Sequence, residues 1–176
     1  PRASAPKAAK RGGIRSHDVR EGYARHVLAV GTHRPALKVA IDCGNGMAGV
    51  GLEAVLAALP IDVVRLYFEP DGSFPNHEAD PLKHENLADV SAAVRLRGAD
   101  FGVAFDGDGD RAVFVDGTGE PVSADLATAL IARHLLARNP GARVLYDLRS
   151  SRVGAEEIEK SGGVAGMCRV GHSFVK

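Results

Sequence analysis

Three aspartates alternate with two glycines in the segment Asp106–Arg111, which reads DGDGDR. Carboxylates at every second residue of a turn can bring their oxygens to one point, and the glycines allow the backbone conformations that this needs. Three anions held so close repel one another unless a cation lies between them. Oxygen ligands select a hard divalent ion, with Mg²⁺ preferred to Ca²⁺ or a softer metal. The segment therefore predicts a magnesium site.

Calcium-binding loops open in a similar way and are the main alternative for this motif. An EF-hand loop requires glycine at its sixth position and an acid at its twelfth. Those positions are Arg111 and Gly117 here, which excludes an EF-hand. A structural Ca²⁺ loop of another kind stays open, whereas the apolar segment in front of the motif disfavours a merely solvated turn. Arginine beside a metal and a phosphate is typical of phosphoryl transfer, so Arg111 is a candidate for holding an anion.

The acidic motif directly follows FGVAF (Phe101–Phe105), which predicts a buried strand. Open α/β sheets place their ligands in loops at the carboxyl ends of strands. Apolar and β-branched runs predict further strands, and apolar residues at helical spacing predict helices, the first of them capped by Asp18. The strands are expected at 37–42, 61–68 and 112–116, and the helices at 18–30, 52–59 and 85–97. This order predicts a three-layer α/β/α fold with a mostly parallel, mixed sheet and one antiparallel excursion near the turn 116–119.

A second, smaller unit is expected from residue 121 onward. Helices are predicted at 123–138 and 150–160, and strands at 143–147 and 164–170. This α/β unit has roughly half the elements of the first, so we expect it to be incomplete, with unpaired strand edges.

Composition restricts the classes of protein to which the chain can belong. The 176 residues carry 22 basic and 22 acidic side chains, which excludes a strongly basic nucleic-acid binder. No apolar run approaches the roughly 18 residues that a membrane span needs. Two cysteines are too few for a disulfide framework and favour the cytoplasm. Residues 1–15 contain five basic residues and no acid, which is typical of a linker or tail, and both ends of the chain are expected to be cut.

Four segments together resemble the α-D-phosphohexomutase superfamily, and most closely its bacterial phosphomannomutase/phosphoglucomutase branch. They are DGDGDR, VAIDCGNGMAG, DGSFPNHEADP and RVGHSFVK, at 106–111, 39–49, 71–81 and 169–176. The resemblance runs from about Gly13 to Lys176. The FPNH segment argues against phosphoglucosamine mutases, which have a different sequence there.

The resemblance implies an isomerase of carbohydrate metabolism with four domains around an active-site cleft. Residues 1–17 would be the linker from a missing first domain, 18–120 the second domain, and 121–176 part of the third. Such enzymes interconvert hexose 6-phosphates and hexose 1-phosphates of mannose or glucose through a hexose bisphosphate. They use Mg²⁺ and a phosphoserine from the first domain, so the expected partners are these sugars and the remaining domains, with no nucleic acid and no membrane.

The same resemblance implies roles for individual residues. Asp106, Asp108 and Asp110 would bind Mg²⁺, and Arg111 would steady the transferring phosphoryl group. Arg169 would face the reacting phosphate, and His172 in the same motif would contact the substrate. Val170 stands where the family commonly has Thr, which removes a hydroxyl contact.

The sequence also departs from the family pattern. It lacks the T-x-S-H-N-P loop that carries the nucleophilic serine, so no catalytic phosphoserine is expected in this chain. We therefore expect the isolated chain to be inactive. The alternative is a non-catalytic, mutase-like module that binds a metal or a partner chain.

Three other polar segments are expected to have structural roles. The turn Asp42–Gly46 lacks both the dinucleotide-binding and the P-loop patterns, and it is expected to pack rather than bind substrate. Asn76 and His77 are expected to order a long polar loop, and the family resemblance adds an interdomain contact as the alternative. Cys43, next to a predicted strand, is expected to be a buried filler rather than a reactive thiol.

Overall fold

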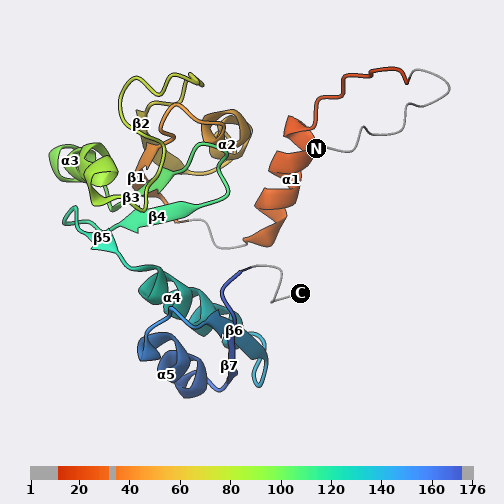
Figure 1. The fold of residues 1–176 in the computed structure, drawn as a ribbon, viewed down its shortest axis with the longest axis vertical. Coiled ribbons are helices and arrows are strands. Elements are labelled where there is room, and N and C mark those ends of the chain that lie inside the picture. The colour runs from red at the N-terminus through yellow and green to blue at the C-terminus, as the bar shows by residue number, and fades with distance from the viewer. Residues whose placement is uncertain (1–11, 32–34, 172–176) are drawn as a thin grey trace, which may run out of the picture.

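A computed structural model describes residues 12–31 and 35–171 (Figure 1). The segment 1–11, which contains most of the predicted basic linker, lies outside the described residues. In chain order the elements are α1 (Arg20–Val30), β1 (Leu37–Asp42), α2 (Ala48–Leu56), β2 (Ile61–Leu66), the 3₁₀ helix η1 (His84–Leu87), α3 (Ala88–Arg97), β3 (Phe101–Phe105), β4 (Ala112–Val115), β5 (Pro121–Val122), α4 (Ala124–Leu136), β6 (Arg143–Asp147), α5 (Arg152–Lys160) and β7 (Val164–Cys168). None of the helices in the described part of the chain has the length and apolar character needed to cross a membrane.

The first unit is built on a five-stranded mixed sheet in the order β2-β1-β3-β4-β5. β1 pairs in parallel with both β2 and β3, whereas β4 and β5 continue the sheet in antiparallel fashion. This confirms the predicted mixed sheet and its antiparallel excursion. β5 lies just beyond the boundary predicted at residue 120 but pairs with β4, so this sheet extends to Val122.

Helices cover both faces of this sheet, as α2 and α3 show in Figure 1. Side chains alternate between the two faces of a strand, and β1 follows this rule. Val39 and Ile41 pack in the cluster that contains Leu56 of α2, whereas Ala40 packs with Val90 and other residues of α3. The layers predicted from the sequence are thus present in the first unit.

Two predicted helix starts were wrong by a few residues. α2 begins at Ala48 rather than at residue 52, because Gly49 lets the first helical turn approach the end of β2. A Cβ at Gly49 would lie 2.4 Å from the carbonyl oxygen of Phe68. The N-cap of α1 is Val19 rather than Asp18, although an Asp18 carboxylate oxygen still accepts the Arg20 amide at 3.0 Å.

The second unit consists of a two-stranded parallel sheet, β6-β7, with the helices α4 and α5. Its small core is formed by Ala132, Leu136 and Ile158, with Val144 and Tyr146 packed against them. On the strands, Leu145 and Met167 are 39% and 60% exposed. Within the described residues the sheet is therefore as small and as incompletely covered as the sequence predicts.

Candidate metal centre

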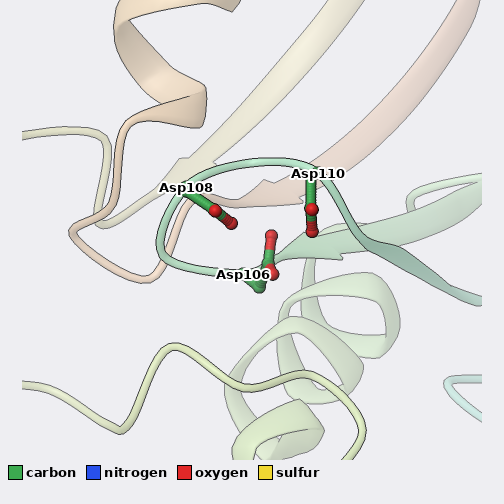
Figure 2. Close-up of side chains that lie close together, drawn as sticks. All are labelled: Asp106, Asp108 and Asp110. Atoms are coloured by element: carbon green, nitrogen blue, oxygen red, sulfur yellow. The ribbon is translucent and has the colours of Figure 1, made fainter.

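The acidic loop, residues 106–111, connects β3 to β4 and curls back on itself. The Gly109 amide donates to the Asp106 carbonyl at 3.1 Å, and the Asp106 amide donates to the Arg111 carbonyl at 3.2 Å. Gly109 has φ +75°, a conformation that other residues rarely adopt. The loop thereby brings carboxylate oxygens of Asp106, Asp108 and Asp110 within 4.8 Å of one another. Figure 2 shows the three side chains converging on the space inside the curve of the loop.

The electrostatics of the cluster fit a cation. Asp110 has a raised pKa because of the negative charges of Asp108 and Asp106 nearby. Burial would raise the pKa of Asp106, but hydrogen bonds from Arg111 outweigh this and hold that pKa below its usual value. Asp106 is buried, whereas Asp108 and Asp110 are exposed and can be reached from solvent. Three oxygen donors of this kind suit a hard divalent ion such as Mg²⁺.

Arg111 joins this loop to its surroundings. Its Nε donates to Asp106 Oδ2 at 2.7 Å and its backbone amide to Asp106 Oδ1 at 3.0 Å. Its Nη1 donates to Asp80 Oδ1 at 3.1 Å. About half of the side chain stays exposed, so part of the guanidinium is available to an anion.

A cavity of about 720 Å³ lies between the two units and includes Arg111 in its lining. The second unit contributes Arg149 and Arg169, which follow the carboxyl ends of β6 and β7, together with Asp147. The Arg149 side chain donates to the Asp147 carboxylate at 2.8 Å and thereby lowers the pKa of that carboxyl group. The cavity therefore combines three guanidinium groups from separate segments of the chain.

The predicted site residues fall into three groups in the structure. Asp106, Asp108 and Asp110 come together, and Arg111 and Arg169 line one cavity. His172 lies outside the described residues. Sequence reasoning missed Arg149, although its place directly after a strand was the same signal that drew attention to the acidic loop.

Two other segments, the β1–α2 turn and the β2–η1 loop, form backbone hydrogen bonds with the acidic loop. Residues 43–46 of the turn between β1 and α2 are buried, and the amide of the next residue, Met47, donates to the Gly107 carbonyl at 2.9 Å. From the β2–η1 loop (residues 67–83), the Ala79 carbonyl accepts the Gly107 amide at 3.1 Å. Asn76 donates to Asn45 at 2.7 Å, and His77 contacts Asp42 at 3.0 Å. The loop-ordering hydrogen bonds predicted for Asn76 and His77 are therefore present.

Sequence comparison finds relatives along nearly the whole chain. Residues 21–119 match the family model described as phosphoglucomutase/phosphomannomutase, alpha/beta/alpha domain II. A phosphomannomutase/phosphoglucomutase from Pseudomonas putida is 42% identical over 165 residues, which are 94% of this chain and 36% of the relative. A phosphoglucomutase from Neisseria gonorrhoeae is 40% identical over 169 residues, or 96% of this chain and 37% of that protein. The chain thus spans about a third of the length of these curated relatives.

Solved structures show the same arrangement of elements. A phosphoglucomutase/phosphomannomutase family protein from Burkholderia thailandensis superposes with a TM-score of 0.86 and 38% identity, over 90% of this chain and 35% of that one. A protein from Thermus thermophilus described as a phosphomannomutase superposes with a TM-score of 0.80 over 93% of this chain and 39% of that one. At 21% identity, this second match supports the fold alone.

Proposed function

Because the chain belongs to the phosphoglucomutase/phosphomannomutase family, we propose that it forms the metal-binding part of a phosphohexomutase. The proposed reaction is the reversible conversion of hexose 6-phosphate to hexose 1-phosphate, with mannose and glucose phosphates as the substrate class. The observation that carries the proposal is the cluster of three carboxylates beside a cavity with three arginines. The names of the relatives agree with it.

Asp106, Asp108 and Asp110 would hold Mg²⁺. When bound, the ion supplies Lewis-acid polarisation and neutralises charge at a phosphoryl group. Three carboxylates exceed the charge of one divalent ion, so the site keeps a net negative charge. A phosphate is attracted to such a place only if further cations lie near it, and this is the role that we assign to the arginines.

Arg111 is the central residue of the anion site in this proposal. Asp106 and Asp80 hold its guanidinium from one side, which fixes its orientation before any substrate arrives. Its remaining N–H groups can donate to phosphate oxygens, and a guanidinium fork suits this geometry. Arg169 and Arg149 would bind phosphate oxygens from the second unit. When arginines of both units bind the same phosphate, they orient the sugar phosphate and reduce the access of water to it.

The phosphoryl carrier in this proposal is a serine of a further domain, outside these 176 residues. The intact enzyme would then be a phosphoprotein with the remaining mutase domains as partners of this chain. The proposed location is the cytoplasm, and the two free cysteines, Cys43 and Cys168, agree with a reducing compartment.

The metal assignment is tested in the intact enzyme with Asp108→Asn, which keeps the size of the side chain and removes its charge. We expect turnover of glucose 1-phosphate to fall by about 100-fold or more, because a ligand of the ion is lost. Asp62→Asn is the matched control, since Asp62 is an exposed strand residue distant in sequence from the loop. Unchanged turnover and Mg²⁺ dependence in Asp108→Asn would refute the assignment.

The alternatives are separated on the 176-residue chain itself. If the chain shows no turnover of glucose 1-phosphate in the presence of its bisphosphate, and if adding the remaining mutase domains restores activity, the proposed function is supported. Calorimetry that shows tight Ca²⁺ binding without any effect of sugar phosphates would instead support a structural calcium loop. Metal binding without any activity after the remaining mutase domains are added would support a non-catalytic module.

A further inference from the structure

Asp42 is a buried carboxylate with no place in the proposed chemistry. Among the described residues, Asp42 and Asp106 are the only charged side chains that are buried. Asp42 ends β1, and its Oδ1 accepts the Gly44 amide at 2.8 Å. Its Oδ2 lies 3.0 Å from Nε2 of His77, 35 residues further along the chain. Burying a lone charge is costly, and the contact with His77 offsets this cost for the Asp42 carboxylate.

His77 is fixed on several sides. Its Nδ1 lies 2.9 Å from the Glu78 carbonyl oxygen, which can only accept a hydrogen bond, so this nitrogen carries a proton. A proton must then also lie between Nε2 and Asp42, on one or the other. The ring meets the edge of Tyr67 at 5.4 Å between centroids, and the Tyr67 hydroxyl donates to Asp89 at 2.7 Å. The imidazole therefore has a single defined orientation.

The residues that follow His77 contact the acidic loop directly. The carbonyl of Ala79 accepts the amide of Gly107 at 3.1 Å. The carboxylate of Asp80 accepts from the guanidinium of Arg111 at 3.1 Å. One contact holds the backbone between two metal-binding aspartates, and the other orients the arginine of the anion site.

The backbone around this contact is strained and must be held by its surroundings. The described residues other than glycine that have positive φ are Asn45, Tyr67 and Phe74, at 57°, 54° and 50°. Two of the three lie in the β2–η1 loop, and Asn45 lies in the turn that it contacts. The Asn45 amide donates to the Tyr67 carbonyl at 2.9 Å. Conformations of this kind persist where several interactions determine them together, and they concentrate at functional sites.

We propose that His77, held by the buried Asp42, is a positioning residue that sets the shape of the acidic loop. It does so by placing the carbonyl of Ala79 against Gly107 and the carboxylate of Asp80 against Arg111. The inference rests on the proposed function only in assuming that the acidic loop binds a metal. His77 itself contacts neither metal nor substrate in this scheme.

The test compares three variants of the 176-residue chain: His77→Ala, the conservative His77→Gln and the matched control His134→Ala on the exposed face of α4. Amide hydrogen exchange at Gly107 is measured without metal, relative to the Val103 amide in β3, so that a global loss of stability cancels. Mg²⁺ affinity is measured on the same samples. In His77→Ala we expect both the relative exchange rate and the Mg²⁺ dissociation constant to rise about tenfold.

His77→Gln keeps a donor towards Asp42 and should recover part of both effects, whereas His134→Ala should leave both unchanged. If His77→Ala fails to fold, His77→Gln and Asp42→Asn carry the test through the same two readouts. Unchanged relative exchange at Gly107 in the folded His77 variants would overturn the inference. If the unaltered chain binds no Mg²⁺, the proposed metal function fails, and the exchange at Gly107 still decides whether His77 positions the loop.

Discussion

The three aspartates of the acidic loop share one short turn but occupy different environments. Asp106 is buried and bonded to Arg111, whereas Asp110 is exposed and has a raised pKa because it faces the other two charges. The three carboxylates repel one another because the loop holds them close together before any ion binds. A cation that neutralises it would stabilise both the loop and the arginine beside it.

The two cysteines provide a direct test of burial at the scale of single residues. Burial, with the nearby charges of Asp42 and Glu53, raises the pKa of Cys43 to about 12, so its thiol stays protonated. Cys168 is partly exposed at the wall of the cavity. We expect a disulfide reagent at neutral pH to modify Cys168 alone in the native chain, and both thiols after unfolding in guanidinium chloride. Rapid native labelling of Cys43 would contradict the structure.

The pair of His77 and Asp42 predicts how stability depends on pH. Burial alone would lower the pKa of His77, but the Glu78 carbonyl and the Asp42 carboxylate outweigh it, so the pKa lies above its usual 6.5. A histidine with a raised folded pKa adds stability that is complete below the unfolded pKa and is lost as pH rises through the folded one. Burial also raises the pKa of Asp42.

We therefore expect the free energy of unfolding to fall as pH increases above about 6.5, and this part of the slope to vanish in His77→Gln. Urea unfolding from about pH 6 to pH 9 measures it. His134→Gln, a change on the exposed surface of α4, should keep the slope of the unaltered chain. An identical slope in His77→Gln would show that the histidine does not titrate with folding.

These residues show what could be predicted from sequence and what could not. The spacing of Asp106, Asp108 and Asp110 predicts their convergence because all three lie within one turn. His77 and Asp42 are 35 residues apart in the sequence, and no local pattern predicts their contact. Arg149 follows a predicted strand, but its sequence alone does not show which residues lie near it; the pairing of β6 with β7 places it and Arg169 at the same edge of the sheet.

At the scale of elements, the close approach of two turns shapes the acidic loop. The turn after β1 and the acidic loop after β3 lie at the carboxyl ends of adjacent parallel strands. The strands themselves are readily predicted from their apolar runs. The start of α2 could not be predicted in this way, because it depends on Gly49 packing against the carbonyl of Phe68. No pattern in the sequence indicates that these two segments are in contact.

Gly46→Ala should disturb this approach. A Cβ at Gly46 would lie 2.6 Å from the carbonyl oxygen of Gly107, which is backbone and cannot rotate away. We expect unfolding free energy to fall by about 1–3 kcal/mol, as in other overpacked sites, and Mg²⁺ affinity to weaken with it. Urea unfolding and calorimetry measure the two effects.

Gly72→Ala is the control, because nothing lies within 4 Å of a Cβ there. It should change stability by no more than about 0.5 kcal/mol. If Gly46→Ala behaves like this control, the two turns are less closely packed than the structure shows.

At the scale of the whole molecule, neither unit forms the proposed anion site alone. The first unit contributes Arg111 and the second Arg149 and Arg169 to the cavity between them. This division explains why the acidic loop could be interpreted from its own sequence, whereas the proposed phosphate-binding surface can be described only with both units in place. It also predicts that binding of a sugar phosphate depends on the second unit even though the proposed metal ligands belong to the first.

Arg149→Gln tests this dependence, because it removes a charge from the second unit and leaves the acidic loop untouched. Losing a charged hydrogen bond to phosphate should weaken glucose 1-phosphate binding about tenfold, while Mg²⁺ affinity in the absence of sugar stays the same. Arg138→Gln, an exposed change beyond the end of α4, should alter neither quantity. Equal weakening of metal and sugar-phosphate binding in Arg149→Gln would mean that the substitution acts through folding. Unchanged sugar-phosphate binding would show that Arg149 does not contact the phosphate, and would leave Arg169 as the arginine of the second unit in the proposed site.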